Sequence, residues 1–263
     1  MVATILENLR ATAPLVHCLT NTVVPQITAN VLLAIGAAPA MIDLPEEAEI
    51  FAGIASAVLI NVGNGSTEQH RAQRRAAAAA SAAGRPWVLD PVAVGALPVR
   101  TALARGLLTH SPACIRGNSS EILGLAGASA GGRGVDATDP VEAALDAASS
   151  LATEHGTVVA ISGEVDLVVS QGRVTRIRGG HALMPLVIGT GCSLGATVAA
   201  ALGASPDRPH DAVVAAHALF AAAGLVAGRD AKGPASFEVA WRDALYTLTP
   251  DEVVRLVEVE DRA

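Results

Sequence analysis

The segment that decides the fold is Gly189-Thr190-Gly191-Cys192-Ser193-Leu194-Gly195-Ala196. An apolar run at 182–188 precedes it, and an alanine-rich run at 195–202 with helical character follows it. The glycines permit a tight turn and let a ligand approach the backbone closely. A helix that begins here points unpaired N–H groups and the positive end of its dipole at that ligand. The segment therefore predicts an anion site, for which phosphate is the usual ligand.

The cysteine in this segment suggests a second role. A thiol at a helix N-terminus tends to have a lowered pKa, so Cys192 is a candidate proton acceptor. Taken alone, the segment fits a strand-to-helix turn with a buried cysteine equally well. Both interpretations stay open at this point.

Composition favours a compact globular protein. Of the 263 residues, 51% are hydrophobic and only 16% are charged, and the net charge of −7 argues against binding to nucleic acid or an anionic membrane. The three distant cysteines indicate a reducing cytoplasm rather than a disulfide scaffold or structural zinc. Glu7 and Arg10 precede any long apolar run, so we expect no secretory signal. Stretches 21–42 and 182–206 are uncharged but broken by Gly and Pro, which predicts helices buried on all sides rather than membrane spans.

Predicted strands and helices alternate along the chain. This pattern is typical of an α/β fold with a mainly parallel central sheet flanked by helices. We expect parallel strands near 15–19, 39–42, 57–62, 86–89 and 113–116, and an antiparallel extension at 157–161, 166–169 and 174–177. Long helices are expected at 23–35, 66–84, 139–155 and 207–230, two more follow from about 235, and 127–134 is expected to be a loop. Since no linker or repeat interrupts the pattern, residues 1–263 form one predicted domain.

Ligands of such sheets bind beyond the C-terminal ends of the strands. The polar residues predicted to lie there are Asn21, Asn64, Asp90, Arg116, Asn118 and Glu121. The planar fork of Arg116 suits phosphate oxygens. Asp90 could bind a cation or cap a helix, and Glu121 could simply cap the helix that it begins. Together with the glycine segment, these side chains supply what phosphoryl transfer needs, although the chain has no GxxxxGK[ST] motif.

Eight short motifs occur in the order typical of one known family, and the sequence resembles the hydroxyethylthiazole kinases, which have the ribokinase-like fold. The motifs are His17-Cys18-Leu19-Thr20-Asn21, Ala34-Ile35-Gly36-Ala37-Ala38-Pro39-Ala40-Met41, Leu89-Asp90-Pro91-Val92, Ile115-Arg116-Gly117-Asn118-Ser119-Ser120-Glu121-Ile122, Ser162-Gly163-Glu164-Val165-Asp166, Gly180-His181-Ala182-Leu183-Met184, Gly189-Thr190-Gly191-Cys192 and Lys232-Gly233-Pro234-Ala235-Ser236-Phe237.

The resemblance implies a three-layer ribokinase-like enzyme of thiamine salvage. It would transfer the γ-phosphate of ATP to the primary hydroxyl of 4-methyl-5-(2-hydroxyethyl)thiazole, with Mg²⁺ required. It also implies a homotrimer with the thiazole site between subunits, for which the stretch 21–42 is a candidate contact. The implied roles are thiazole binding by Met41 and Gly189, ATP binding by Asn21, Arg116 and Ser162, magnesium binding by Asp90 and Glu121, an anion hole at Gly189, Thr190, Gly191 and Cys192, and catalysis by Cys192, which stands where many ribokinase-like enzymes carry an aspartate base.

The sequence departs from the family pattern at two positions. Ile188 stands where the family usually has threonine, and Ala93 replaces a glycine. Both changes could weaken nucleotide binding or shift the preferred acceptor. The alternatives are a related small-alcohol kinase, such as hydroxymethylpyrimidine kinase, and a nucleotide-binding module without turnover. Acceptor-dependent formation of ADP distinguishes among these functions.

Overall fold

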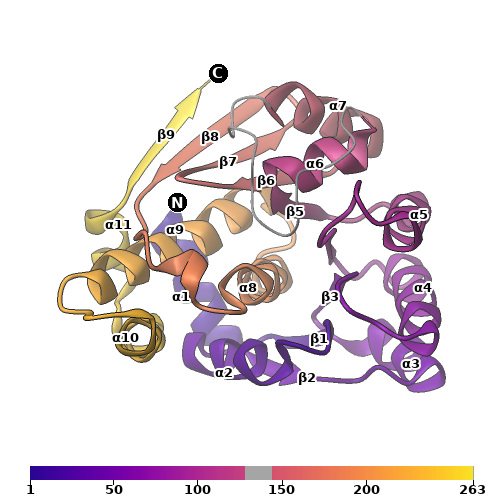
Figure 1. Cartoon of the computed structure of the whole chain (residues 1–263), viewed down its shortest axis with the longest axis horizontal. Coiled ribbons are helices and arrows are strands. Elements are labelled where there is room, and N and C mark those ends of the chain that lie inside the picture. The colour runs from indigo at the N-terminus through magenta and orange to yellow at the C-terminus, as the bar shows by residue number, and fades with distance from the viewer. Residues whose placement is uncertain (128–143, 263) are drawn as a thin grey trace.

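A single twisted sheet runs through the whole molecule (Figure 1). The computed structural model describes residues 1–127 and 144–262. Within these residues nine strands lie in the order β2-β1-β3-β4-β5-β6-β7-β8-β9. The strands from β2 to β6 are parallel, and β7, β8 and β9 extend the sheet in antiparallel fashion. Their bounds are β1 Leu15–Leu19, β2 Ala38–Ala40, β3 Ala57–Asn61, β4 Trp87–Asp90, β5 Cys114–Asn118, β6 Val158–Ser162, β7 Val165–Ser170, β8 Arg173–Arg178 and β9 Glu258–Arg262.

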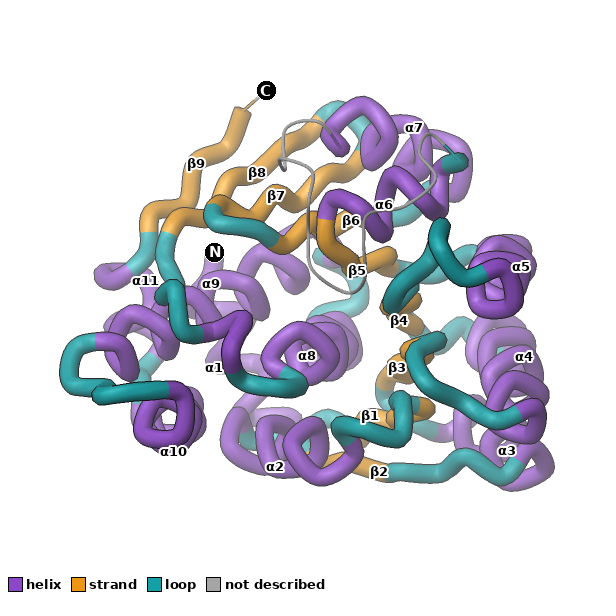
Figure 2. The backbone as a smooth tube through the Cα atoms, in the orientation of Figure 1, coloured by secondary structure: helices purple, strands orange, loops and turns teal. Residues whose placement is uncertain are grey.

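Helices cover both faces of the sheet and make a three-layer structure (Figure 2). On one side of the sheet lie α1 Val2–Thr12, α2 Pro25–Ile35, α8 Thr190–Ala204, α9 Pro209–Gly228, α10 Pro234–Thr247 and α11 Pro250–Leu256, of which α10 and α11 pack against other helices. The other face packs against α3 Pro45–Ile54, α4 Thr67–Ala82, α5 Pro98–Leu107, α6 Ser119–Ala126 and α7 Leu145–His155. The predicted α/β class and the mainly parallel sheet are confirmed. The antiparallel extension is present at 166–169 and 174–177, but the strand predicted at 157–161 is parallel to β5 and belongs to the parallel part of the sheet.

The local sequence explains these elements. Strand β3 is buried along its full length, and its side chains alternate between the two cores: Leu59 faces α8, whereas Val58 and Ile60 face α4. Parallel strands that are covered on both faces read as continuous apolar runs, which is why they were found in the sequence. Helix α8 is apolar all round and lies so close to the sheet that a methyl group on Gly195 would come within 3.3 Å of Asp90.

Helix α8 begins at Thr190, within the glycine segment as predicted, but three other expectations need correction. Stretch 21–42 is not buried on all sides, because Leu33 on the outer face of α2 is 59% exposed. The run at 182–188 is an exposed loop with a 3₁₀ turn at Met184–Leu186. Strand β2 ends at Ala40, so Met41 and Ile42 lie beyond it.

One strand was not predicted, and two predicted features cannot be compared with the structure. Strand β9 was not foreseen and adds a ninth strand at the sheet edge. The predicted loop at 127–134 and the predicted helix start at 139 fall largely outside the described residues. Among the helices described, α9 alone is long and apolar enough to cross a membrane, and 78% of its apolar window is buried inside the fold, as in a core helix.

Candidate active site

The candidate site lies at the C-terminal ends of the parallel strands, next to the N-terminus of α8. The strand order reverses between β1 and β3, and crevices at such switch points are where open α/β sheets bind ligands. Of the residues predicted from the sequence, Asn21 follows β1, Asp90 ends β4, Arg116 lies in β5 and Ser162 ends β6. The fold therefore brings four strands and one helix start to the same edge of the sheet.

A chain of hydrogen bonds runs along this edge of the sheet and connects the first turn of α8 with the ends of β3 and β4. The Asn21 amide donates to Cys192 Sγ at 3.4 Å and to Asn61 Oδ1 at 3.1 Å. The Asn61 amide in turn donates to Asp90 Oδ2 at 2.8 Å. Asn61 is fully buried and was missed in the sequence, where Asn64 was named instead. A buried asparagine inside an apolar run is the signal that could have revealed it, because such a group needs partners.

Arg116 continues this set of contacts toward β6. One guanidinium nitrogen, Nη1, lies 4.0 Å from Asp90 Oδ2, and the other, Nη2, donates to Ser162 Oγ at 2.7 Å. A methyl group on Gly191 would lie only 3.0 Å from Nη1. Glycine at this position therefore lets the guanidinium rest against the first turn of α8. The fold thus places Arg116, Ser162 and the glycine segment next to one another.

The start of α8 presents free backbone donors. Gly189 caps the helix with φ +92°, a left-handed conformation that favours glycine, and it packs against Ile27 and Val24 of the α2 region. The first N–H groups of a helix have no partner within it. In the described part of the chain, the N–H groups of Gly191 and Cys192 accordingly form no backbone hydrogen bond. These donors and the adjacent Arg116 make an anion-binding concavity.

Asp90 carries the most unusual charge in the site. Its carboxyl is fully buried, and Oδ1 has no hydrogen-bond partner among the described residues. Burial raises the pKa of Asp90 to about 7; the Arg116 charge opposes this shift, Glu121 adds to it and the Asn61 hydrogen bond opposes it. A buried carboxylate with one unsatisfied oxygen is suited to a cationic ligand.

Glu121 has a structural role that is visible directly. Its Oε2 accepts from the Asn118 N–H at 2.9 Å and its Oε1 accepts from the Ala93 N–H at 3.0 Å, so it closes the capping box that begins α6. Burial raises the pKa of Glu121 against the lowering effect of these backbone donors and of nearby arginines. No cluster of three His, Cys, Asp or Glu side chains occurs in the described ranges, so any metal here would have few protein ligands.

The expected low pKa of Cys192 is wrong. Burial, aided by the negative charge of Asp90, raises the pKa of the thiol to about 12, and Arg116 and two asparagine amides only partly offset this. Gly195 is the reason that Asp90 comes so close, since it lets α8 pack directly against β4. At pH 7, only about one Cys192 side chain in 10⁵ is then present as the thiolate.

Three other residues lie apart from these contacts. Met41 follows edge strand β2 and is 38% exposed, and Asn64 lies on an exposed loop where it accepts from Arg100. Ile188 is 71% exposed beside the Gly189 turn. Ala93, by contrast, lies within the site with φ +56°, a left-handed conformation that explains why glycine is typical there.

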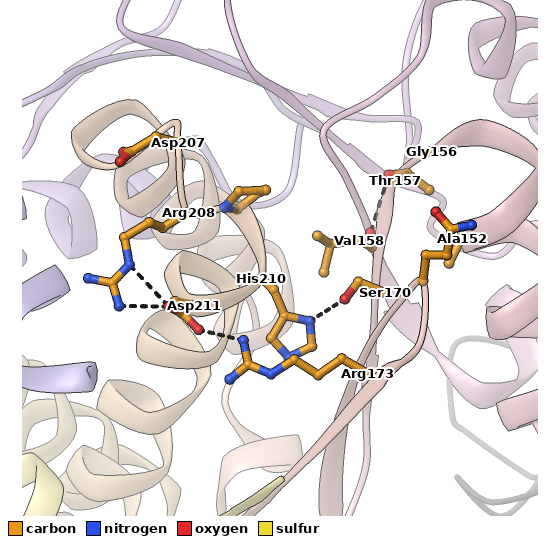
Figure 3. Close-up of a pocket in the computed structure, with 12 residues that line it drawn as sticks. Ala152, Gly156, Thr157, Val158, Ser170, Arg173, Asp207, Arg208, His210 and Asp211 are labelled. Carbon is orange, nitrogen blue, oxygen red and sulfur yellow. Dashed lines mark hydrogen bonds and ion pairs between the residues drawn. The ribbon is translucent and has the colours of Figure 1, made fainter. Parts of the chain in front are cut away.

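A separate cavity of about 420 Å³ lies at the opposite, N-terminal edge of the strands (Figure 3). His210 at the start of α9 bridges Ser170 Oγ and Thr175 Oγ1, each at 2.7 Å. Asp211 accepts from Arg173 and Arg208, each at 2.7 Å. His210, Asp211 and the two arginines of this cavity are thus already engaged with neighbouring polar groups.

Comparisons with known proteins agree on one family. The model of the "HK: Hydroxyethylthiazole kinase family" matches residues 6–251. The chain is 56% identical to the hydroxyethylthiazole kinase of Corynebacterium glutamicum over 255 residues, which is 96% of this chain and 95% of that protein. It superposes on the hydroxyethylthiazole kinase structure from Pyrococcus horikoshii with a TM-score of 0.91 at 34% identity, covering 100% and 99% of the two chains. A Staphylococcus aureus pyridoxal kinase in complex with AMP-PCP has the same fold, with a TM-score of 0.66, 16% identity and 94% and 97% coverage.

Proposed function

Since the chain belongs to the hydroxyethylthiazole kinase family, we propose that it transfers the γ-phosphate of ATP to the primary hydroxyl of 4-methyl-5-(2-hydroxyethyl)thiazole. The observation that carries this proposal is the closeness of Arg116 to both Asp90 and the first turn of α8, where the N–H groups of Gly191 and Cys192 form no backbone hydrogen bond with the described residues. Phosphoryl transfer is catalysed mainly by positioning and by stabilising charge, and these groups serve both purposes.

The nucleotide would bind across β5, β6 and the start of α8. Arg116 and Ser162 would contact its phosphates, Asn21 would contribute from β1, and the backbone from Gly189 to Cys192 would form the anion hole. The nucleotide analogue in the S. aureus pyridoxal kinase supports a nucleotide site on this fold. Arg116 is already held by Ser162, so little side-chain entropy is lost when phosphate binds.

Magnesium fits the residues present. The unpartnered, buried Oδ1 of Asp90 is a suitable oxygen ligand, and Glu121 would contribute through water because both of its oxygens already accept backbone N–H groups. When bound, the ion would neutralise charge on the phosphates. Arg116 would share that task from the side of β5, and the Asn61 amide would keep the Asp90 carboxylate in a fixed orientation.

Cys192 would assist at the acceptor hydroxyl. With its pKa near 12, the side chain is a thiol at neutral pH and can receive a proton only as transient thiolate. Its position beside Asn21 lets it orient the hydroxyl through a hydrogen bond. The loose transition state of phosphoryl transfer lessens the need for a strong base, so orientation accounts for most of its contribution.

The thiazole would lie near Gly189 and Met41, with a second subunit completing the site. Exposed apolar side chains surround the α2 and β2 edge, namely Val23, Leu33, Met41 and Leu44. Such a patch favours association, and the proposed assembly is a homotrimer of 26.4 kDa chains in the cytoplasm. Light scattering on the purified protein tests the assembly, and a monomer would contradict it.

The reaction is tested by measuring ADP formation with Mg²⁺-ATP, with and without hydroxyethylthiazole. Hydroxymethylpyrimidine serves as the competing acceptor. ADP formation that depends on the thiazole supports the proposal. Turnover with the pyrimidine alone would retain the site but replace the substrate. Nucleotide binding without turnover on either acceptor would indicate a module that has lost catalysis.

A further inference from the structure

Two buried histidines, His17 and His217, have no place in the chemistry described above, yet each contacts a segment next to a proposed subsite. We propose that they position the two subsites separately: His17 holds the backbone beside Met41 for the acceptor, and His217 holds the turn at 162–165 for the nucleotide. This inference rests on the proposed function. Both act through neighbouring segments, so they are positioning residues.

His17 holds the chain just after Met41. It lies within β1, is fully buried, and its Nε2 is 2.8 Å from the carbonyl oxygen of Ile42. A carbonyl can only accept, so Nε2 carries the proton and donates. The ring packs edge-on against Phe51 of α3, with centroids 5.3 Å apart at 76°. Phe51 therefore fixes the direction in which this donor points.

This bond matters because the sheet itself does not hold the segment. Strand β2 is an edge strand of three residues, and its pairing with β1 ends at Ala40. Met41 and Ile42 continue past the last paired residue, and among the described strands none lies on their other side. The His17 side chain supplies the hydrogen bond that a longer ladder would have supplied, and it sets the backbone from which the Met41 side chain extends.

His217 acts in the same way at the other subsite. It is fully buried on α9, and its Nδ1 lies 2.7 Å from Asp166 Oδ2. The other oxygen of Asp166, Oδ1, accepts from the Gly163 N–H at 2.9 Å. Asp166 thus joins α9 to the turn that begins with Ser162, which is also the partner of Arg116. Loss of His217 would release the carboxylate that fixes this turn.

The second ring nitrogen of each histidine argues against a mere packing role. In the part of the chain that the structure describes, Nδ1 of His17 and Nε2 of His217 are buried without a hydrogen-bond partner. Burying an unsatisfied polar atom is destabilising, and an apolar side chain of similar size would avoid that cost. The single bond that each histidine makes to a subsite segment accounts for a polar group at these two positions.

The variants of the two histidines serve as controls for each other. His17→Leu should raise KM for hydroxyethylthiazole about five- to tenfold and leave KM for ATP unchanged, as expected for the loss of roughly one hydrogen bond. His217→Leu should raise KM for ATP by a similar factor and leave KM for the thiazole unchanged. Calorimetric titrations with ADP and with hydroxyethylthiazole measure the same split without turnover.

Conservative variants separate positioning from general damage. In His17→Gln the amide nitrogen replaces Nε2, and in His217→Asn it replaces Nδ1, so both should restore the affected KM to within about twofold. If a leucine variant does not fold, Asp166→Ala on the partly exposed side of the pair should still raise KM for ATP, and Phe51→Leu should raise KM for the thiazole slightly.

Specific outcomes overturn the proposal. A lower melting temperature with both KM values unchanged would leave the histidines as structural residues only. A parallel rise in both KM values would show that the two segments are not held independently. If the wild type shows no thiazole-dependent turnover, the proposed function fails. The ADP titration still tests the role of His217 in that case. If the wild type also fails to bind the thiazole, the proposed role of His17 is overturned.

Discussion

The two ends of the sheet treat buried polar groups in opposite ways. At the C-terminal end, Asp90 Oδ1 has no hydrogen-bond partner among the residues that the structure describes, and the N–H groups of Gly191 and Cys192 form no backbone hydrogen bond with them. At the N-terminal end, the cavity around His210 is rich in charge, but Asp211 binds both of its arginines and His210 binds two hydroxyl groups (Figure 3). This cavity is therefore the weaker candidate for a ligand site, because most of its charged side chains already bind neighbouring groups.

The difference separates polar groups that stabilise the fold from polar groups that lower its stability but can bind a ligand. Paired groups around Asp211 stabilise the junction of β8, α9 and β9, where Arg173 also contacts Asp261 at 2.9 Å. Unpaired groups at the other end destabilise the free protein but are ready for a charged ligand, since a site that is organised in advance need not rearrange. Substitutions at the C-terminal end should consequently change catalysis, whereas substitutions at the N-terminal end should change the free energy of unfolding.

The largest effect is expected from Asp90→Asn. Removal of this negative charge should lower kcat by at least about 10²-fold, as for the loss of other groups aimed at the transition state. The same variant should be more stable at pH 8, by on the order of 1 kcal/mol, because a buried carboxylate is lost. Activity and urea unfolding on the same preparation test both statements.

The stability gained by Asp90→Asn should depend on pH in a definite direction. The folded pKa of Asp90, about 7, exceeds the ordinary value of 3.8, so between these values the folded chain retains a proton that the unfolded chain releases. The stability from this group is complete below about pH 4 and falls as pH rises toward 7. The advantage of Asn over Asp should therefore be near zero at pH 4 and largest above pH 7. An advantage that shrinks as pH rises would contradict the raised pKa.

At the opposite end, Asp211→Asn should change stability and not catalysis. The carboxylate accepts from two arginines and is only 14% exposed, so its loss should lower the free energy of unfolding by about 2–3 kcal/mol. KM and kcat should stay the same. Glu46→Gln is the matched control, because Glu46 also pairs with two arginines but is 66% exposed, and it should cost less than about 1 kcal/mol. Equal losses in the two variants would remove burial as the explanation.

Cys192→Ala should reduce turnover without abolishing it. A fall in kcat of about ten- to a hundredfold is expected, at or below the range for general-base groups, because the thiol is rarely ionised. Cys192→Ser, which keeps a hydrogen-bonding hydroxyl, should lose less. Steady-state kinetics with saturating ATP checks the order of the three proteins. An alanine variant with full kcat would reduce Cys192 to packing.

The smallest effect concerns the backbone of the site. Ala93 has φ +56°, and replacing it with glycine should stabilise the protein by about 0.5–1 kcal/mol by relieving the left-handed conformation. Ala13, with φ +44° at the end of α1, provides a control far from the site. If Ala13→Gly gains stability and Ala93→Gly does not, Ala93 is not strained and the departure from the family pattern has another cause.

Prediction from the sequence succeeded where the pattern was local. Apolar runs such as 57–62 predicted buried strands, and the polar residues after them predicted the edge at which Asp90 and Arg116 meet. It failed for β9, whose residues are mostly charged. That strand is held by its neighbour, with Glu258 beside Arg178 and Asp261 beside Arg173, so its sequence has no apolar pattern to detect.

By itself, the sequence determined the class of fold, the family and the residues that gather at one edge of the sheet, because periodic burial and short motifs are local properties of the chain. Only the tertiary structure decided the electrostatics. Gly195 and Gly191 let α8 approach Asp90 and Arg116, and this packing makes Cys192 a weak acid and leaves one oxygen of Asp90 without a partner in the described part of the chain. The pKa of a group depends on neighbours that are distant in sequence and on the water excluded between them, and neither can be read from residue order.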